Sequence, residues 1–145
     1  MTDQLRVMFD ENMGRPLVRA LSKLLAFHDP PPVVMHLIDF EHHQGADDRV
    51  WIPKLVDDGW VVVSSDRGRK KRYAQLPTIC QKLRVTHFLF SGALHNSKQF
   101  EKARAVITLW PRIVEAATDA RGKRYLMQKG RLHPVLKEKP APVEQ

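Results

Sequence analysis

Cysteine is almost absent from this sequence, and long apolar runs are absent altogether. The single cysteine, Cys80, excludes an intramolecular disulfide framework and is typical of a reducing compartment. No apolar stretch approaches the roughly 20 residues that a membrane-spanning helix needs. The opening residues, MTDQLRVMFDEN, lack the basic start and apolar run of a signal peptide. The sequence therefore predicts a cytoplasmic protein with no membrane partner.

Several catalytic signatures are also missing. The chain has no phosphate-cradling glycine loop, no nucleophile elbow and no internal repeat. His42 and His43 are adjacent, but no cysteine or third histidine follows them at the spacing of zinc ligands. The sequence thus gives no support for a zinc site.

Acidic residues are outnumbered by basic ones. Lys and Arg total 24 against 16 Asp and Glu, which gives a net charge of +8 and a pI of about 9.9. This excess favours a polyanionic partner, nucleic acid first among them. The length of 145 residues, with 43% hydrophobic residues, is most simply one domain with a real core.

Short apolar runs alternate with helical patterns along the chain. Strands are predicted at Leu5–Phe9, Val33–Ile38, Trp60–Ser65 and Thr86–Gly92. Helical patterns cover residues 14–28, 49–59 with a break at Pro53, 78–83, and a segment from Lys98 that Ser97 would cap and Pro111 would kink. This alternation predicts an α/β fold with an open, mostly parallel sheet covered on both faces.

The chain divides by pattern into three parts. Residues 1–119 are predicted to form the α/β domain. Residues 120–136 are predicted to form a basic, hairpin-like extension with two short strands across Lys129 and Gly130. Residues 137–145 are predicted to be a flexible tail.

Two aspartates, Asp10 and Asp66, each directly follow a predicted strand. In open parallel sheets, ligands bind at the carboxyl ends of the strands, so both acids are expected at the functional edge. Glu11 adjoins Asp10, and Asp47-Asp48 precede the next helix. Clustered carboxylates repel one another unless a divalent cation neutralises them, and Mg²⁺ and Mn²⁺ prefer oxygen ligands. Alternatively, each acid is a turn former or a helix cap.

A basic block follows the second aspartate. It consists of Arg67, Arg69, Lys70, Lys71 and Arg72. These side chains either surround an acidic pocket and bind nucleic-acid phosphates, or form a solvated loop. Ser91 follows the fourth predicted strand, where its hydroxyl either faces the same pocket or ends the strand.

The stretches VMFDEN and DDRVWIPKLVDDGWVVVSSDRGRKKR resemble the PIN-like nucleases, most closely the subgroup related to the toxins of bacterial toxin–antitoxin pairs. The resemblance covers about residues 5 to 95. It implies a three-layer α/β/α fold, cleavage of RNA, a cognate antitoxin protein and a homodimer. It also implies that Asp10, Asp48 and Asp66 hold Mg²⁺ or Mn²⁺, that Glu11 is a direct or indirect ligand, and that Asn12 orients the turn.

The sequence departs from that family in two places. The acid at Asp48 lies three residues before Trp51, where the family typically has two, and Arg67-Gly68-Arg69 occupy the region in which a further acid is common. We therefore expect one tightly held ion, with a second recruited by substrate.

Three other classes were compared with this pattern. A non-catalytic nucleic-acid-binding or interaction protein would keep the fold with a degraded site. A phosphoacceptor receiver domain would need a lysine after a late fifth strand, and none is convincing. A haloacid-dehalogenase-like phosphatase would need Asp-x-Asp, whereas the third position here is Asn12.

Overall fold

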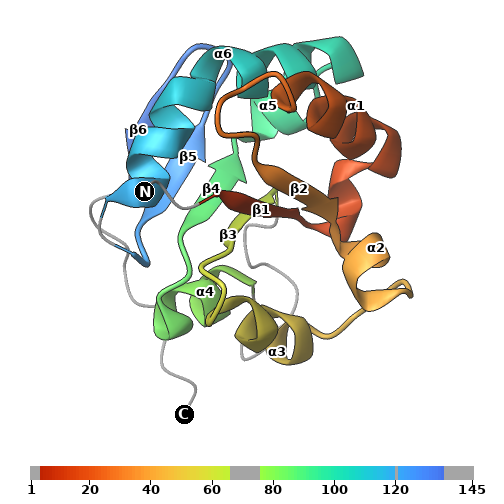
Figure 1. The fold of residues 1–145 in the computed structure, drawn as a ribbon, viewed down its shortest axis with the longest axis vertical. Helices are drawn as coiled ribbons and strands as arrows, with labels where there is room; N and C mark the ends of the chain where they lie inside the picture. Colours follow the sequence, from red (N-terminus) through yellow and green to blue (C-terminus); the bar gives the residue numbers. More distant parts are fainter. Residues whose placement is uncertain (1–3, 66–75, 120, 136–145) are drawn as a thin grey trace.

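The computed structural model describes residues 4–65, 76–119 and 121–135 (Figure 1). Its centre is a six-stranded sheet in the order β2-β1-β3-β4-β5-β6. The strands are β1 (Arg6–Phe9), β2 (Val33–His36), β3 (Val61–Ser64), β4 (His87–Phe90), β5 (Arg124–Met127) and β6 (Leu132–Pro134). Every pairing is parallel except that of β5 with β6. The predicted α/β class with a mostly parallel sheet is therefore confirmed.

Helices lie on both faces of this sheet (Figure 1). They are η1 (Glu11–Met13), α1 (Arg15–Leu25), α2 (Leu37–Glu41), α3 (Asp48–Trp51), η2 (Ile52–Leu55), α4 (Leu76–Leu83), α5 (Gly92–His95) and α6 (Gln99–Thr118), with η1 and η2 being 3-10 helices. All residues of the Val-rich strand β3 are buried, because the sheet is covered on both sides at its centre.

The alternation of side chains along the strands produces two separate cores. One core packs α1 and α6 against one face of the sheet, with Phe9, Val63 and Phe88 among its members. The other packs residues of α2, α3, η2 and α4 against Met8 and Val62 on the opposite face. Three layers result, and they present the carboxyl ends of the strands at one edge.

The structure tests two predictions about helix limits, one for Pro53 and one for Ser97. The helix that Pro53 was expected to interrupt is indeed two short pieces, α3 and η2. The prediction that Ser97 caps the long helix is wrong, because Lys98 is the N-cap of α6. The Ser97 hydroxyl instead donates to the Leu94 carbonyl at 2.6 Å, so it is committed to the preceding turn. Helix α6 runs continuously through Pro111.

The two strands predicted across Lys129-Gly130 are present as β5 and β6, and β5 pairs in parallel with β4. Gly122, with φ of +88°, makes the turn into β5; a Cβ there would lie 2.9 Å from the Arg84 Cα. The hairpin thus continues the main sheet. The division at residue 120 stays a prediction, and the proposed tail, 137–145, lies outside the described residues. Among the helices that the structure describes, none has the length and hydropathy to cross a bilayer.

Candidate active site

Asp10 lies at the carboxyl end of β1 and is only 7% exposed. Its Oδ1 accepts a hydrogen bond from the Glu11 N–H at 2.9 Å, which makes it the N-cap of η1. Its own N–H donates to the Val63 carbonyl at 3.0 Å. The aspartate is therefore fixed at the carboxyl end of β1, next to the end of β3, the strand that leads to Asp66.

Asp66 itself lies outside the described residues, and so does the whole basic block, Arg67, Arg69, Lys70, Lys71 and Arg72. Within residues 4–65, 76–119 and 121–135, no group of three or more His, Cys, Asp or Glu side chains is arranged to hold a metal ion. The predicted set of three aspartates requires Asp66 and so remains a prediction.

Glu11 connects the end of β1 to the loop that precedes α3. Its two carboxylate oxygens accept hydrogen bonds from the Gly45 N–H at 3.2 and 3.1 Å. Because Gly45 lies three residues before Asp48, this contact sets the position of α3 relative to Asp10. Asn12 is an exposed residue of η1. Direct metal binding by Glu11 and orientation of the turn by Asn12 stay predictions.

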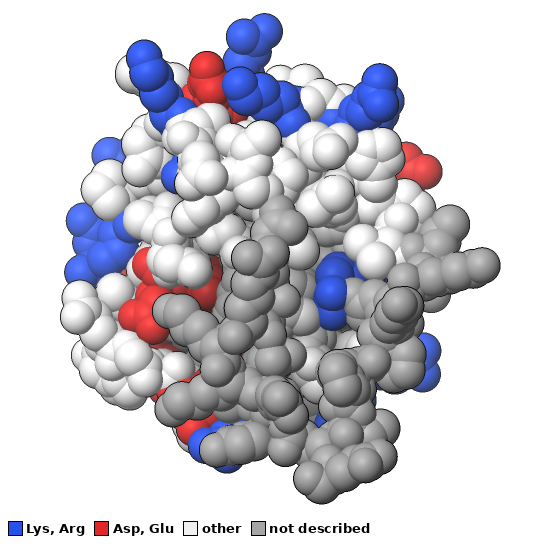
Figure 2. All heavy atoms as spheres, turned by 180° about the vertical axis from the view of Figure 1, so that it is seen from behind, with Lys and Arg blue, Asp and Glu red and all other residues white. Residues whose placement is uncertain are grey.

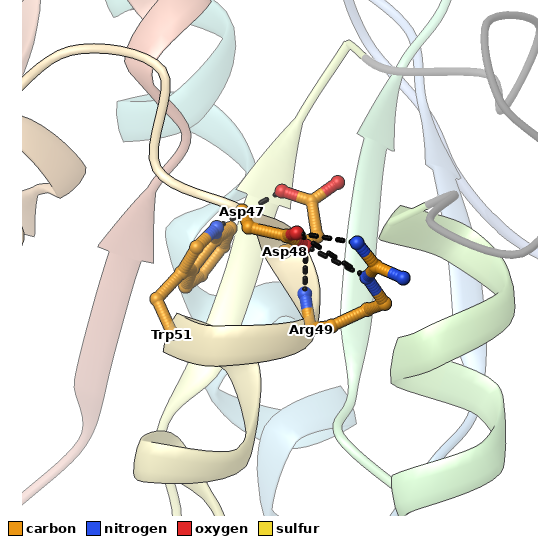
Figure 3. A network of polar contacts seen from close by, with 4 residues as sticks. All are labelled: Asp47, Asp48, Arg49 and Trp51. Carbon is orange, nitrogen blue, oxygen red and sulfur yellow. Dashed lines mark hydrogen bonds and ion pairs between the residues drawn. The ribbon is translucent and has the colours of Figure 1, made fainter.

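Two adjacent carboxylates at the start of α3 have different partners (Figure 3). The Asp48 Oδ1 accepts from the indole N–H of the fully buried Trp51 at 2.9 Å. The Asp47 side chain caps the helix through the Arg49 N–H at 2.9 Å and pairs with the Arg49 guanidinium at 2.7 Å. The spacing of three residues explains the Asp48 contact, since positions i and i+3 are neighbours on a helix.

His36 at the end of β2 is part of the same edge and was missed from the sequence. The Ile38 N–H donates to its Nδ1 at 3.1 Å, so Nε2 carries the proton and donates to the Glu11 carbonyl, also at 3.1 Å. Burial lowers the pKa of His36 below its ordinary value, which favours this neutral form. The signal in the sequence was a single polar residue inside the predicted strand Val33–Ile38.

A second buried histidine, His87, lies within the sheet. Its Nε2 is 2.6 Å from the Ser64 Oγ, and both residues are almost completely buried. Burial, with a smaller effect of the Arg124 charge, lowers the pKa of His87 to about 3. This pair holds the last residue of β3, two positions before Asp66. A histidine between Thr86 and the apolar residues Phe88–Phe90 was the signal in the sequence.

Ser91 follows β4 and starts α5. Its Oγ accepts from the Leu94 N–H at 3.1 Å, and its N–H donates to the Met127 carbonyl at 2.9 Å. The hydroxyl thus has a capping task, and its predicted supporting role in the site stays a prediction.

Over the face seen in Figure 2, Asp and Glu gather on one flank and Lys and Arg lie mainly around the periphery.

Comparison with family models matches residues 5–92 to a family described as a PIN like domain. No curated protein and no solved structure matches the chain. The matched segment covers more than half of the 145 residues and spans strands β1 to β4, with Asp10, Glu11 and Asp48 inside it. PIN-like domains are commonly nucleases. The chain therefore belongs to the PIN-like domain family.

Proposed function

We propose that this chain is a metal-dependent endoribonuclease that hydrolyses RNA phosphodiesters, and that it is the toxin of a toxin–antitoxin pair. The observation that carries the nuclease is the position of Asp10. This buried acid is hydrogen-bonded to β3, which runs on to Asp66, and it is linked through Glu11 to the loop that begins the helix of Asp48. β1, β3 and the loop before α3 thus meet at the carboxyl ends of the strands, and the sequence continues from β3 to Asp66.

The predicted ligands suit a hard divalent cation, because all of them offer carboxylate oxygens. Asp10, Asp48 and Asp66 would hold Mg²⁺ or Mn²⁺, and Glu11 would either bind the ion directly or keep the other acids in place. When bound, such an ion activates water and neutralises charge on the reacting phosphodiester. The chain itself supplies a fixed Asp10, because its Oδ1 and its backbone N–H are both in hydrogen bonds.

The partner in this proposal is RNA. The net charge of +8 favours a polyanion, and the block Arg67, Arg69, Lys70, Lys71 and Arg72 adjoins Asp66 in the sequence. These side chains would contact phosphates on either side of the cleaved bond. The cognate antitoxin and a homodimer complete the proposal, and both rest on the resemblance of VMFDEN and DDRVWIPKLVDDGWVVVSSDRGRKKR to the toxin subgroup.

One observation favours a second function, a non-catalytic nucleic-acid-binding protein. The Asp48 Oδ1 is taken up by the Trp51 indole, so Asp48 has a structural task that needs no metal. The sequence also has Arg67 and Arg69 where a further acid is common in the family. Such a protein would keep the fold and the basic charge without cleaving RNA.

The test compares Asp10→Asn and Asp66→Asn with the wild type on total RNA. With Mg²⁺ or Mn²⁺ we expect cleavage that a chelator abolishes and that each variant reduces at least about a hundredfold, or ~2.7 kcal/mol in the barrier. Asp57→Asn serves as the matched control, since Asp57 is an exposed acid in the turn before β3. It lies at the amino end of that strand, away from the candidate site at the carboxyl ends. This control should cleave like the wild type.

Two outcomes would count against the nuclease. Cleavage that survives unchanged in both variants would point to a contaminant or to another site. RNA binding without cleavage, weakening steeply with salt, would support the non-catalytic protein instead.

A further inference from the structure

Large apolar side chains are exposed mainly on one pair of neighbouring helices. Among the described residues these exposed side chains are Leu24 at 53%, Phe27 at 91%, Val50 at 53%, Phe100 at 91% and Ile107 at 36%. All except Val50 belong to α1, to the turn directly after it, or to α6. Single exposed apolar residues are ordinary, but aromatic rings at 91% exposure on adjoining elements call for an explanation.

Helices α1 and α6 pack side by side on the same face of the sheet (Figure 1). At their beginnings, the Gln99 side chain lies 3.8 Å from where a Cβ of Gly14 would be. Further along, the rings of His28 and Trp110 meet edge to face at a centroid distance of 6.1 Å. The two helices therefore run in the same direction, with their outer surfaces next to each other.

The exposed apolar residues of α1 form a row on the side of the helix nearer α6. Ala20 and Leu24 are spaced i and i+4 on α1, Phe27 follows in the turn directly after the helix, and all three are exposed. Arg15 lies about half a turn away from Leu24 and pairs with Asp39 of α2 at 2.5 Å. Because that ion pair marks the side facing α2, the apolar row is on the opposite side.

A matching row lies on α6. Phe100, Ile107 and Pro111 are spaced i, i+7 and i+11, and all are exposed. Glu101 marks the far side of α6, because its carboxylate pairs with Lys129 of the β5–β6 turn at 2.9 Å. The two rows together form what we call the α1–α6 apolar surface: Ala20, Leu24, Phe27, Phe100, Ile107 and Pro111.

The charges on this surface are mostly positive. Helix α1 carries Arg15, Arg19 and Lys23 and no acid. Arg19, Lys23 and Arg104 are exposed on the outer side of the two helices. Glu101 is neutralised by Lys129, whose hydrogen bond and charge lower the pKa of Glu101. A partner for this surface therefore needs an apolar row with carboxylates beside it.

We propose that the α1–α6 apolar surface binds an acidic amphipathic helix of another protein. The row on α6 covers 11 residue steps, or about 16 Å, which matches about three turns of a partner helix. A second copy of this chain fits less well, because two-fold pairing through the same surface would bring Arg19, Lys23 and Arg104 of both copies together. This proposal does not depend on nuclease activity, since no acid of the candidate active site is included in the surface.

The test uses two labelled synthetic peptides. The first is helical, with leucines at i, i+4, i+7 and i+11 and glutamates at the flanking positions. The second is a scrambled peptide of equal charge. Fluorescence anisotropy should show saturable binding of the first peptide. Phe27→Ser combined with Phe100→Ser should weaken it at least tenfold, and Arg19→Glu combined with Lys23→Glu should weaken it most at low salt. Val50→Ser is the control, since Val50 is also an exposed apolar residue, at 53%, but lies on α3.

Three outcomes would overturn the proposal. The first is equal binding of the ordered and scrambled peptides, or equal binding by wild type and by the Phe27→Ser, Phe100→Ser protein. The second is a dimer in light scattering that these two substitutions dissociate, because the surface would then join two copies of this chain. The third is co-sedimentation with vesicles of anionic lipid, without peptide binding, that the same substitutions abolish.

Discussion

His87 is a histidine that the fold keeps uncharged. The folded protein lowers its pKa to about 3 through burial, whereas an unfolded chain titrates it near 6.5. Between these values the unfolded state binds a proton that the native state does not, so unfolding is favoured as the pH falls. Above pH 6.5 the group is neutral in both states and has no effect. The stability contributed by neutral His87 is thus fully present above pH 6.5 and is lost progressively toward pH 3.

We predict that His87→Gln flattens the acid limb of the stability profile. The variant loses some stability at pH 7, because the hydrogen bond between Ser64 and His87 in the core is lost, at a cost of about 1–3 kcal/mol. Its urea midpoint should fall less than that of the wild type between pH 6.5 and 4, since glutamine does not titrate. The exposed His43 gives the control, His43→Gln, whose profile should follow the wild type. Parallel acid limbs for wild type and His87→Gln would contradict the assignment.

At the scale of elements, the candidate site depends on contacts between segments that are distant in the chain. Glu11 accepts from Gly45, and the Glu11 carbonyl accepts from His36. The start of η1 is thereby joined to the end of β2 and to the loop that enters α3. A side chain that binds these segments together need not touch a metal ion to matter for activity.

We predict that Glu11→Gln and Glu11→Ala separate these two roles. If Glu11 acts by holding the α3 loop, glutamine retains a carbonyl acceptor for Gly45 and most of the activity. Alanine removes it and should lower RNA cleavage and Mn²⁺ affinity about tenfold, or ~1.4 kcal/mol. Mn²⁺ binding is measured by electron paramagnetic resonance alongside cleavage. An equal loss in both variants would instead identify Glu11 as a direct ligand.

For the whole molecule, charge is the dominant property. A protein with a net charge of +8 binds nucleic acid partly by releasing counterions, whatever its catalytic state. General attraction and a specific phosphate contact are distinguished by the salt slope of binding, because each phosphate contact adds a fixed increment to that slope.

We predict that replacing Arg69, Lys70 and Lys71 by Ala weakens binding of single-stranded RNA and lowers the slope of log K against log salt by about 2. The matched control removes the same charge from the α1–α6 side, through Lys23→Ala, Arg104→Ala and Arg112→Ala. That protein should keep nearly the wild-type slope. An unchanged slope in the first variant would remove the basic block from the set of phosphate contacts.

Much of this protein was determined by local sequence. Alternation of apolar runs such as VVVS with helical segments fixed the α/β class and placed Asp10 at a strand end, because periodicity and chain direction are local properties. The break at Pro53 was predictable for the same reason. The wrong capping role for Ser97 shows the limit, because the Ser97 hydroxyl donates to the Leu94 carbonyl of the preceding turn and Lys98 is the N-cap of α6.

Only the tertiary structure decided which side chains meet. The contacts of Glu11 with Gly45, of Glu11 with His36 and of Ser64 with His87 each join residues more than 20 positions apart, and periodicity carries no information about such pairs. Likewise, the sequence showed that Phe27 and Phe100 are apolar, but only the packing of α1 beside α6 left both exposed on neighbouring helices. Burial is a property of the assembled layers, because a side chain is hidden from water by elements that its own segment does not specify.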